Sequence, residues 1–415
     1  MSKRLIVTNT FYQLASRAIS ALTSATITIL VARQLSVVDF GQFIKMVNYV
    51  TIFMMPIDFG LNAIVVRTIT YQTKHTSSQL SLLTSFRLAL ASMLILISIV
   101  IATFLPSSGT QGFTPLVKLG IYILSFQLFA FAIIRSLNAL FQKLLQYQFT
   151  LIAETITSIV VLFSLYLTLA HTRSIITLTW GYAVGGSLAA LSLYLITRLK
   201  KVSLTLSFNY LKWRQLFLSS LPLGLTLIIN TLIARFDILM LSLTRPTPEV
   251  GFYGLAKRVF ELVLVFPVFF TNSLYPLLLK RPHKRPLVTK SLFALLTIAL
   301  LSFLILYPAA PLFAWIKSDF TASINLFRIL LFSLPIFFTT ALLMWTLISL
   351  KKERLLPKIY LFALLFNLVS NSITIPVFGA SAAAFNVIIT EAIALAGLTY
   401  FVLKSLRSKK AKTYV

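Results

Sequence analysis

The segment LALASMLILISIVIATFL, residues 88–105, contains no charged residue and is long enough to cross a membrane as a helix. Similar apolar segments recur along the whole 415-residue chain, which is 58% hydrophobic and only 11% charged. A soluble domain of this composition would have too little polar surface to cover its core. The sequence therefore predicts an all-α polytopic membrane protein with no separate soluble domain.

About twelve transmembrane helices are predicted from the apolar segments and the polar junctions between them. The predicted spans are residues 10–31, 43–65, 88–105, 116–135, 149–170, 175–197, 216–243, 251–279, 291–313, 326–349, 358–378 and 380–403. An internal repeat supports two bundles of six helices, because DFGQF at 39–43 follows the first span and EVGFY at 249–253 follows the seventh. An even number of helices in each half makes this a parallel repeat. We expect an N-terminal bundle at 1–197, a basic linker at 198–214 and a C-terminal bundle with a basic tail at 215–415.

The basic residues predict the orientation. The chain has 37 Lys and Arg against 9 Asp and Glu, and most of the basic residues gather at every second junction. Arg87 and Arg135 are assigned to two of these basic junctions, and Lys257 to one of the sparser junctions on the other side. Basic loops stay in the cytoplasm, so both termini are expected there. The clustered charge would contact anionic membrane lipids rather than nucleic acid.

The first span carries a polar stripe whose members are spaced by three or four residues. They are Asn9, Gln13, Arg17, Ser20, Ser24 and Thr28. This spacing places them on one face of a helix. Such a face either packs against another helix through hydrogen bonds or lines a water-filled cavity. The charge of Arg17 at this depth favours the cavity.

The seventh span has a comparable face with Asn230 and Asp237. Arg235 lies about 200° from Asp237 around the helix, so the two cannot pair within it. Each therefore needs its own partner, from another helix, water or a ligand. The alternative for Arg235 is that it extends toward the membrane surface or pairs with an acid such as Glu154 or Glu261.

Three acids in or near the spans, Asp58, Asp237 and Glu391, are candidates to carry a coupling H⁺ or Na⁺, with a structural hydrogen bond as the alternative role for each. The chain has no Cys, which excludes disulfides and thiol nucleophiles. It also has no phosphate-binding Gly loop or metal-ligand pattern. We therefore expect no cofactor, no metal site and no catalytic residues.

Several short motifs resemble those of one transporter family. They are VARQL at 31–35, DFGQF at 39–43, DFGL at 58–61, LPLG at 221–224 and EVGFY at 249–253. With them, the whole chain looks like a Wzx-type polysaccharide-biosynthesis flippase (O-antigen or capsule) of the multidrug/oligosaccharidyl-lipid/polysaccharide exporter group.

The resemblance implies a MATE-like architecture and transport of undecaprenyl-diphosphate-linked oligosaccharides from the inner to the outer leaflet of the bacterial inner membrane. It also implies a cavity that is often cationic, coupling to an ion gradient, and partners such as a polysaccharide polymerase and chain-length machinery. Arg17, Arg33 and Arg235 are the candidates for the cationic lining, with Gln13 and Asn230 beside them. Guanidinium groups suit diphosphate or acidic sugars because they donate paired hydrogen bonds.

Three other functions are alternatives to this one. A MATE-like drug/cation antiporter would require an acidic cavity, whereas the arginines within the spans favour an anionic cargo. A membrane-embedded polysaccharide polymerase or ligase would require a long catalytic loop, and the predicted outer junctions are short. A purely structural membrane scaffold leaves the polar stripes without a role.

Overall fold

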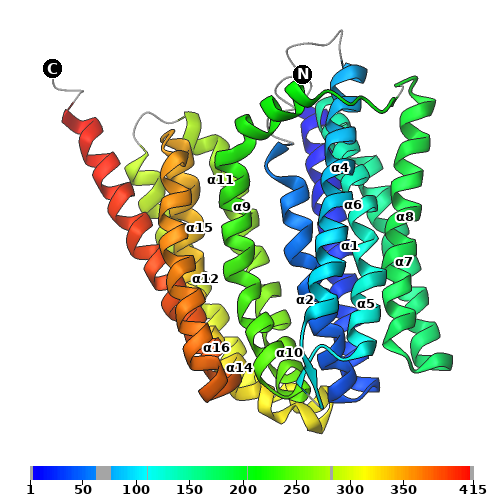
Figure 1. The fold of residues 1–415 in the computed structure, drawn as a ribbon. Helices are drawn as coiled ribbons and strands as arrows, with labels where there is room; N and C mark the ends of the chain where they lie inside the picture. Colours follow the sequence, from blue (N-terminus) through cyan, green and yellow to red (C-terminus); the bar gives the residue numbers. More distant parts are fainter. Residues whose placement is uncertain (1–2, 62–75, 110, 203, 281–283, 412–415) are drawn as a thin grey trace. The chain divides into compact units, whose positions relative to one another are not determined.

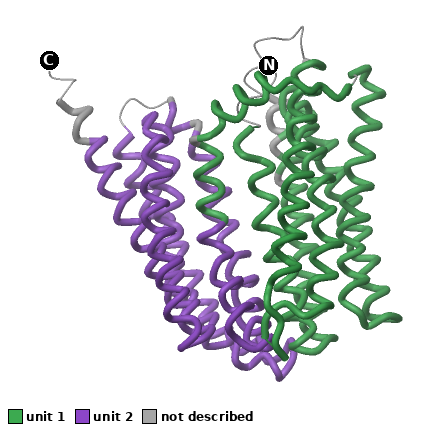
Figure 2. Tube along the Cα trace, viewed as in Figure 1, with its two compact units in different colours: residues 1–231 green, residues 232–415 purple. Residues whose placement is uncertain are grey.

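The computed structural model describes residues 3–61, 76–109, 111–202, 204–280 and 284–411, and nearly all of them are helical (Figure 1). The chain divides into two compact units, Met1–Thr231 and Leu232–Val415, coloured green and purple in Figure 2. The boundary falls inside one long helix, α9 (Tyr210–Thr244). The expected division at a 198–214 linker stays a prediction.

Unit 1 contains long helices and one small hairpin. The helices are α1 (Lys3–Gln34), α2 (Val37–Asp58), α4 (Thr76–Phe104), α5 (Pro115–Ser125), α6 (Gln127–Leu144), α7 (Gln148–Leu167), a π-helical turn (Thr168–Thr172), α8 (Ile175–Leu199) and the first part of α9. Strands β1 (Ser107–Ser108) and β2 (Gln111–Gly112) pair antiparallel between α4 and α5. Helix α7 packs against α1 and α8, and α6 packs against α4 and α8.

Unit 2 begins with the second part of α9. Its helices are α10 (Thr247–Val263), α11 (Val265–Lys280), α12 (Arg285–Ala309), α13 (Leu312–Ile316), a 3₁₀ turn (Ser318–Phe320), α14 (Thr321–Leu331), α15 (Leu334–Ser349), a second 3₁₀ turn (Glu353–Leu355) and α16 (Leu356–Ala411). Within this unit α15 packs against α11, α12 and α16, while α10 packs against α14.

Local sequence explains where α2 begins and ends. Ser36 caps its first turn, because the Ser36 hydroxyl accepts a hydrogen bond from the Asp39 N–H at 3.0 Å and donates one to the Asp39 carboxylate at 2.7 Å. The negative charge of Asp39 also suits the positive end of the helix dipole. Phe59 and Gly60 both have positive φ, of 39° and 66°, and so end the helix.

Long apolar side chains cover the outer faces of the helices, where Leu96, Phe104, Ile305 and Phe378 are all more than half exposed. Such surfaces are stable in lipid and not in water. In the described ranges, eight helices are long and apolar enough to cross a membrane, or nine if the bent pair α14 and α15 forms one span. Every predicted span falls on a helix or on two consecutive helices, although residues 62–65 lie outside the described ranges. The predicted all-α membrane fold is confirmed, and a count of twelve helices is consistent with it.

Gly379 divides α16 into its two halves, because its φ of 61° is not helical. The carboxylate of Glu249 occupies the space beside it, where one oxygen accepts the Ala380 N–H at 2.7 Å and the other accepts the Arg245 Nε–H at 2.7 Å. A Cβ on residue 379 would collide with the Glu249 carboxylate.

We expect Gly379→Ala to lower the thermal midpoint of the purified protein more than Gly109→Ala does. Gly109 has a similar φ of 53°, and no atom lies within 4 Å of the place that a Cβ would take, so alanine there costs only the backbone strain, about 1 kcal/mol. Gly379→Ala adds the displacement of Glu249 and should reach roughly 3 kcal/mol. Equal shifts in the two variants would show that the Glu249 contact is unimportant.

Candidate functional site

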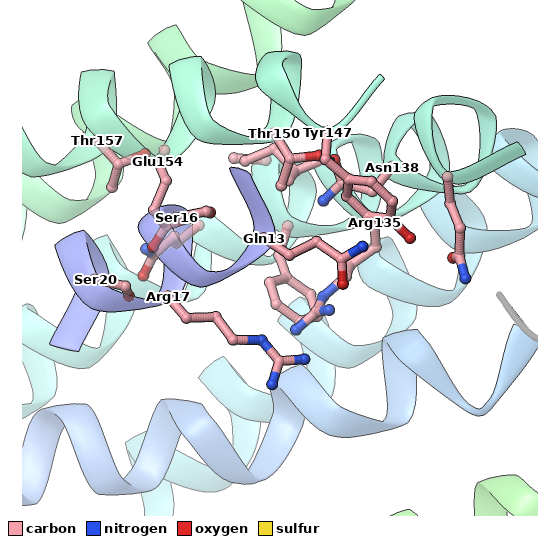
Figure 3. Close-up of a pocket in the computed structure, with 16 residues that line it drawn as sticks. Gln13, Ser16, Arg17, Ser20, Arg135, Asn138, Tyr147, Thr150, Glu154 and Thr157 are labelled. Atoms are coloured by element: carbon pink, nitrogen blue, oxygen red, sulfur yellow. The ribbon is translucent and has the colours of Figure 1, made fainter. Parts of the chain in front are cut away.

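A polar cavity of about 700 Å³ lies within unit 1, between α1, α6, α7 and a glycine of α8. Figure 3 shows side chains from these helices pointing into it. Its lining comprises Gln13, Ser16, Arg17, Ser20, Gln127, Ala130, Phe131, Ile134, Arg135, Asn138, Gln142, Tyr147, Thr150, Glu154, Thr157 and Gly186. Two guanidinium groups therefore share the cavity with one carboxylate and many neutral hydrogen-bonding groups.

Helix α1 contributes part of the stripe that its sequence pattern indicated. Gln13, Arg17 and Ser20 line the cavity, together with Ser16. Further along the same face, the Thr28 hydroxyl donates to the Ser24 carbonyl at 2.8 Å and lies outside the cavity. The start of the stripe has a structural role, because Asn9 Oδ1 accepts the Tyr147 N–H at 3.1 Å and so ties α1 to the turn between α6 and α7.

The opposite wall comes from α6 and α7. The Arg135 guanidinium lies over the Phe131 ring, 4.8 Å from its centroid, an arrangement that favours the cation and fixes its direction. The Thr150 hydroxyl donates to Asn138 Oδ1 at 2.9 Å and joins the two helices. Gln13, Arg17 and Arg135 all line this cavity, and Figure 3 shows the Arg17 side chain extending from α1.

Arg135, assigned to a basic junction, lies within a helix rather than in a connecting loop. Helix α6 continues to Leu144, so Arg135 lies well inside it and lines the cavity. Hydropathy ended the predicted span at the charge itself, although the helix continues past it. The polar residues Gln127, Asn138 and Gln142 share a helical face with Arg135, and this pattern could have identified the position.

Two other candidates from unit 1 lie outside the cavity. Arg33 is exposed in the last turn of α1, and Asn230 is half-buried on α9. Neither belongs to the cavity lining. Their proposed part in substrate binding therefore has no support from this cavity.

Asp58, also in unit 1, belongs to a buried ion pair. Arg87 is completely buried and donates to the Asp58 carboxylate at 3.0 Å, the Ile57 carbonyl at 3.2 Å and the Asp58 carbonyl at 3.3 Å. These carbonyls belong to the last turn of α2, where backbone carbonyls have no N–H partner within the helix. Arg87 lies within a helix rather than in a connecting loop, because α4 begins at Thr76.

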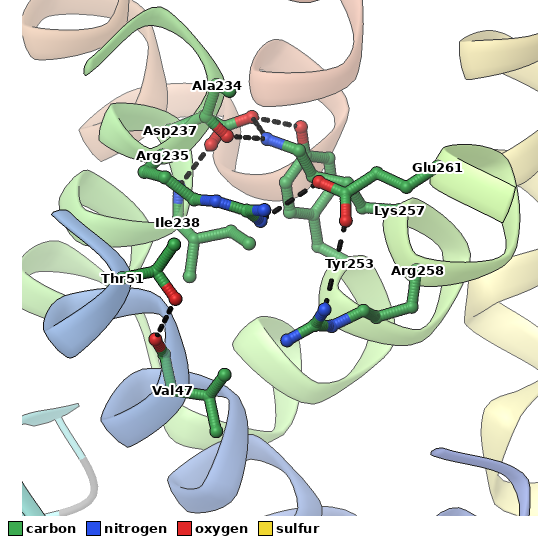
Figure 4. Close-up of polar contacts among 10 residues, drawn as sticks. All are labelled: Val47, Thr51, Ala234, Arg235, Asp237, Ile238, Tyr253, Lys257, Arg258 and Glu261. Atoms are coloured by element: carbon green, nitrogen blue, oxygen red, sulfur yellow. Dashed lines mark hydrogen bonds and ion pairs between the residues drawn. The ribbon is translucent and has the colours of Figure 1, made fainter. Parts of the chain in front are cut away.

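Unit 2 holds a second charged cluster on α9 and α10, drawn in Figure 4. The buried carboxylate of Asp237 accepts hydrogen bonds from Lys257 Nζ at 2.5 Å, Tyr253 Oη at 2.5 Å and the Ile238 N–H at 2.7 Å. The assignment of Lys257 to an outer junction is wrong, because Lys257 is buried inside α10. Asp237 is thus neutralised by a resident ammonium group.

Arg235 pairs with Glu261 at 2.9 Å, and Glu261 also lies 3.9 Å from Arg258. Arg235 and Asp237 have different partners, as the helical spacing requires. Glu261 is one of the two acids that the sequence suggested as the partner of Arg235. Arg235 therefore forms its ion pair with a carboxylate of the protein itself.

Glu391 differs from the other two coupling candidates. It is buried on the second half of α16 and accepts a hydrogen bond from the Thr340 hydroxyl of α15. Neighbouring polar groups bridge the two halves of α16, where Asn367 donates to Thr390 at 3.1 Å and Asn386 donates to Asn371 at 2.8 Å. Among the described residues no cationic side chain lies within ion-pair distance of Glu391.

The chemistry of the unit 1 cavity suits an anionic ligand rich in hydroxyl groups. Guanidinium groups bind phosphate oxygens through charge-assisted hydrogen bonds. Amides and hydroxyls, here mainly from α1, α6 and α7, match the donors and acceptors of sugars. In the part of the chain that the structure describes, no group of three or more His, Asp or Glu residues is arranged to hold a metal ion.

Comparisons with known proteins bear on the family and the fold. A family model described as "Polysaccharide biosynthesis protein" matches residues 6–282. No match to a curated protein sequence was found.

Several solved structures have a similar fold at low sequence identity, among them one flippase and two MATE transporters. The lipid II flippase MurJ in an inward closed conformation gives a TM-score of 0.71 at 14% identity, over 95% of this chain and 89% of that one. An inward-facing multidrug resistance MATE family transporter of the MOP superfamily gives 0.70 at 14% identity, over 97% and 96%. The Vibrio cholerae MATE transporter VcmN in the bent form gives 0.62 at 15% identity, over 98% of both chains. At identities this low, the similarity establishes a shared fold and no more.

Proposed function

The chain belongs to the polysaccharide biosynthesis protein family, and on that premise we propose that it is a flippase for a polyprenyl-diphosphate-linked oligosaccharide. The cargo would be an undecaprenyl-diphosphate-linked repeat unit of O-antigen or another surface polysaccharide. It would move from the inner to the outer leaflet of the bacterial inner membrane by alternating access, with both termini of the protein in the cytoplasm. The observation that carries this proposal is the cavity lined by Arg17 and Arg135.

Each part of the cavity has a role in this proposal. Arg17 and Arg135 bind the diphosphate, whose charge makes it the costliest part of the cargo to move through lipid. Gln13, Asn138 and Thr150 hydrogen-bond the sugars in place of water. The cavity thus lowers the barrier by replacing the hydration of the head group.

Ion coupling is assigned to Glu391 within this proposal. Asp58 and Asp237 are held by Arg87 and Lys257, so binding a proton or Na⁺ there would first break an ion pair. Glu391 is buried without such a partner among the described residues. Glu391→Gln should therefore abolish the dependence of transport on an H⁺ or Na⁺ gradient, and unchanged gradient dependence would remove Glu391 from the coupling step.

The likeness to the lipid II flippase MurJ supports a lipid-linked cargo. A MATE-like antiporter of cationic drugs is the second candidate, since the fold is shared with MATE transporters. The excess of guanidinium over carboxylate groups in the cavity argues against it, because cationic drugs would be repelled.

Deletion of the gene in its own bacterium tests the proposal. The lipid-linked oligosaccharide should accumulate in the cytoplasmic leaflet, where it is protected from a glycosidase added outside, and surface glycan should fall. Complementation with the wild-type gene should restore both. Unchanged surface glycan together with greater sensitivity to cationic drugs would instead support the antiporter.

A further inference from the structure

A second cavity, which we call the apolar slot, lies in unit 1 between α4, α6, α8 and the extended segment after α8, and has a volume of about 450 Å³. Its lining comprises Thr84, Ser85, Leu88, Phe129, Ala130, Ile133, Ser187, Ala190, Leu191, Tyr194, Leu204, Thr205 and Leu206. No charged side chain occurs in this set.

Three of the five hydroxyl side chains in the slot donate to the backbone of their own helices. Thr84 donates to the Leu80 carbonyl at 2.8 Å, Ser85 to the Ser81 carbonyl at 2.8 Å, and Ser187 to the Ala183 carbonyl at 2.8 Å. Because these donors are satisfied within the helices, the slot offers a ligand mainly hydrocarbon contacts. Its chemistry is opposite to that of the polar cavity.

The slot and the polar cavity adjoin at a contact between small residues. Ala130 of α6 lines both. On α8, Gly186 lines the polar cavity and the next residue, Ser187, lines the slot. A Cβ at Gly186 would lie in van der Waals contact with the Ala130 Cβ and the Gln127 Cγ, both at 3.4 Å, so α6 and α8 pack closely at this junction. The polar and apolar spaces therefore lie side by side along α6 and α8.

The wall at the far end of the slot is held in place by α4. The Thr205 N–H donates to Ser81 Oγ at 3.1 Å, and the Ser207 N–H donates to Ser85 Oγ at 2.8 Å. Both serines are buried on α4. Leu191 and Leu206 are exposed at the rim, so a chain longer than the slot has an apolar exit.

An amphiphile with an anionic head and a long hydrocarbon chain matches this pair of spaces. We propose that the apolar slot binds the diphosphate-proximal part of the polyisoprenyl chain of the cargo while the diphosphate lies in the polar cavity. The inference rests on the proposed function. It assigns recognition of the lipid to α4, α6 and α8, and assigns the head group to α1, α6 and α7.

The test measures binding of two probes to purified protein in detergent, inorganic diphosphate and undecaprenyl diphosphate. Ser187→Phe and Ala190→Phe place a ring in the slot, and Val184→Phe is the matched control because Val184 is exposed on α8 outside the lining. Thermal melting of every variant verifies folding.

We expect both slot variants to weaken undecaprenyl diphosphate binding by on the order of tenfold, the effect of excluding about two methylene groups from an apolar site. Inorganic diphosphate should bind all four proteins equally, and Val184→Phe should behave like wild type. Unchanged undecaprenyl diphosphate affinity in folded Ser187→Phe would overturn the slot assignment.

Two further results are distinguishable. In a competition assay, a phospholipid without a polyprenyl chain is compared with undecaprenyl phosphate. If the two compete equally, and this competition is lost in the slot variants, the slot is a general lipid site and the proposal is overturned. Failure of wild type to bind inorganic diphosphate, with chain-dependent binding retained, would contradict the proposed head-group site and leave the slot assignment standing.

Discussion

Replacement of both Arg17 and Arg135 by Gln is expected to reduce transport of the lipid-linked oligosaccharide by at least about a hundredfold. A hydrogen bond to a charged group contributes about 1.5–3 kcal/mol, so each arginine accounts for roughly tenfold or more in binding. Gln keeps a polar side chain but removes the charge that offsets the diphosphate. Each single variant should show a smaller loss, because the remaining guanidinium still faces the same cavity.

The lysine variants separate charge from geometry. Arg17→Lys and Arg135→Lys should retain part of the activity, since lysine keeps the charge but cannot form the paired contacts of a guanidinium. Arg33→Gln is the matched control, because Arg33 lies on the same helix, exposed and outside the cavity lining. Transport is measured as surface glycan in a deletion strain at equal membrane expression. Normal glycan in the double Gln variant would remove this cavity from the mechanism.

Arg87→Met is expected to lower the stability of unit 1 by about 3–5 kcal/mol, the cost of breaking a buried ion pair on one side. Met retains much of the side-chain volume while removing all donors. The Asp58 carboxylate and the carbonyls of Ile57 and Asp58 would then lose their hydrogen bonds in the protein interior. The expected result is a large fall in the thermal midpoint and in the yield of folded protein.

Two comparisons make the Arg87 prediction specific. Arg87→Met combined with Asp58→Asn should be more stable than Arg87→Met alone, because the unpaired charge is gone. Lys317→Met is the exposed control, since the Lys317–Asp319 pair is 3.1 Å long and about half of the Asp319 side chain is exposed. Its effect should stay within about 1 kcal/mol. An Arg87→Met midpoint no lower than that of Lys317→Met would contradict the structural role of Arg87.

The fold could be predicted from the sequence because the length of an apolar run and the lipid solvent together determine a spanning helix. The face of α1 that carries Gln13 and Arg17 was likewise predictable, since helical periodicity alone brings these residues together. Their place in a cavity depends on α6 and α7, which supply Arg135 and Glu154 from distant parts of the chain. Local sequence contains no such information.

The predicted spans that stop at Arg87 and Arg135 are too short for one physical reason. Hydropathy ends a span at a charged residue, whereas a helix continues wherever that charge finds a partner inside the protein. Arg87 is compensated by Asp58 and by helix-end carbonyls, and Lys257 by Asp237. Arg135 lies over an aromatic ring beside a water-accessible cavity. Hydropathy therefore ends predicted spans at Arg87 and Arg135, although both lie within helices, whereas Lys257 already falls inside the predicted span 251–279.

Transbilayer movement of a defined cargo by the purified protein is the most direct test of flippase activity. Proteoliposomes would contain an undecaprenyl-diphosphate-linked sugar in the inner leaflet, with appearance in the outer leaflet followed by an added sugar-specific enzyme. We expect rapid movement with wild-type protein, near-background movement with the Arg17→Gln and Arg135→Gln double variant, and wild-type movement with Arg33→Gln. Background movement with folded wild-type protein under H⁺ and Na⁺ gradients of either direction would show that the protein is not a flippase for this cargo.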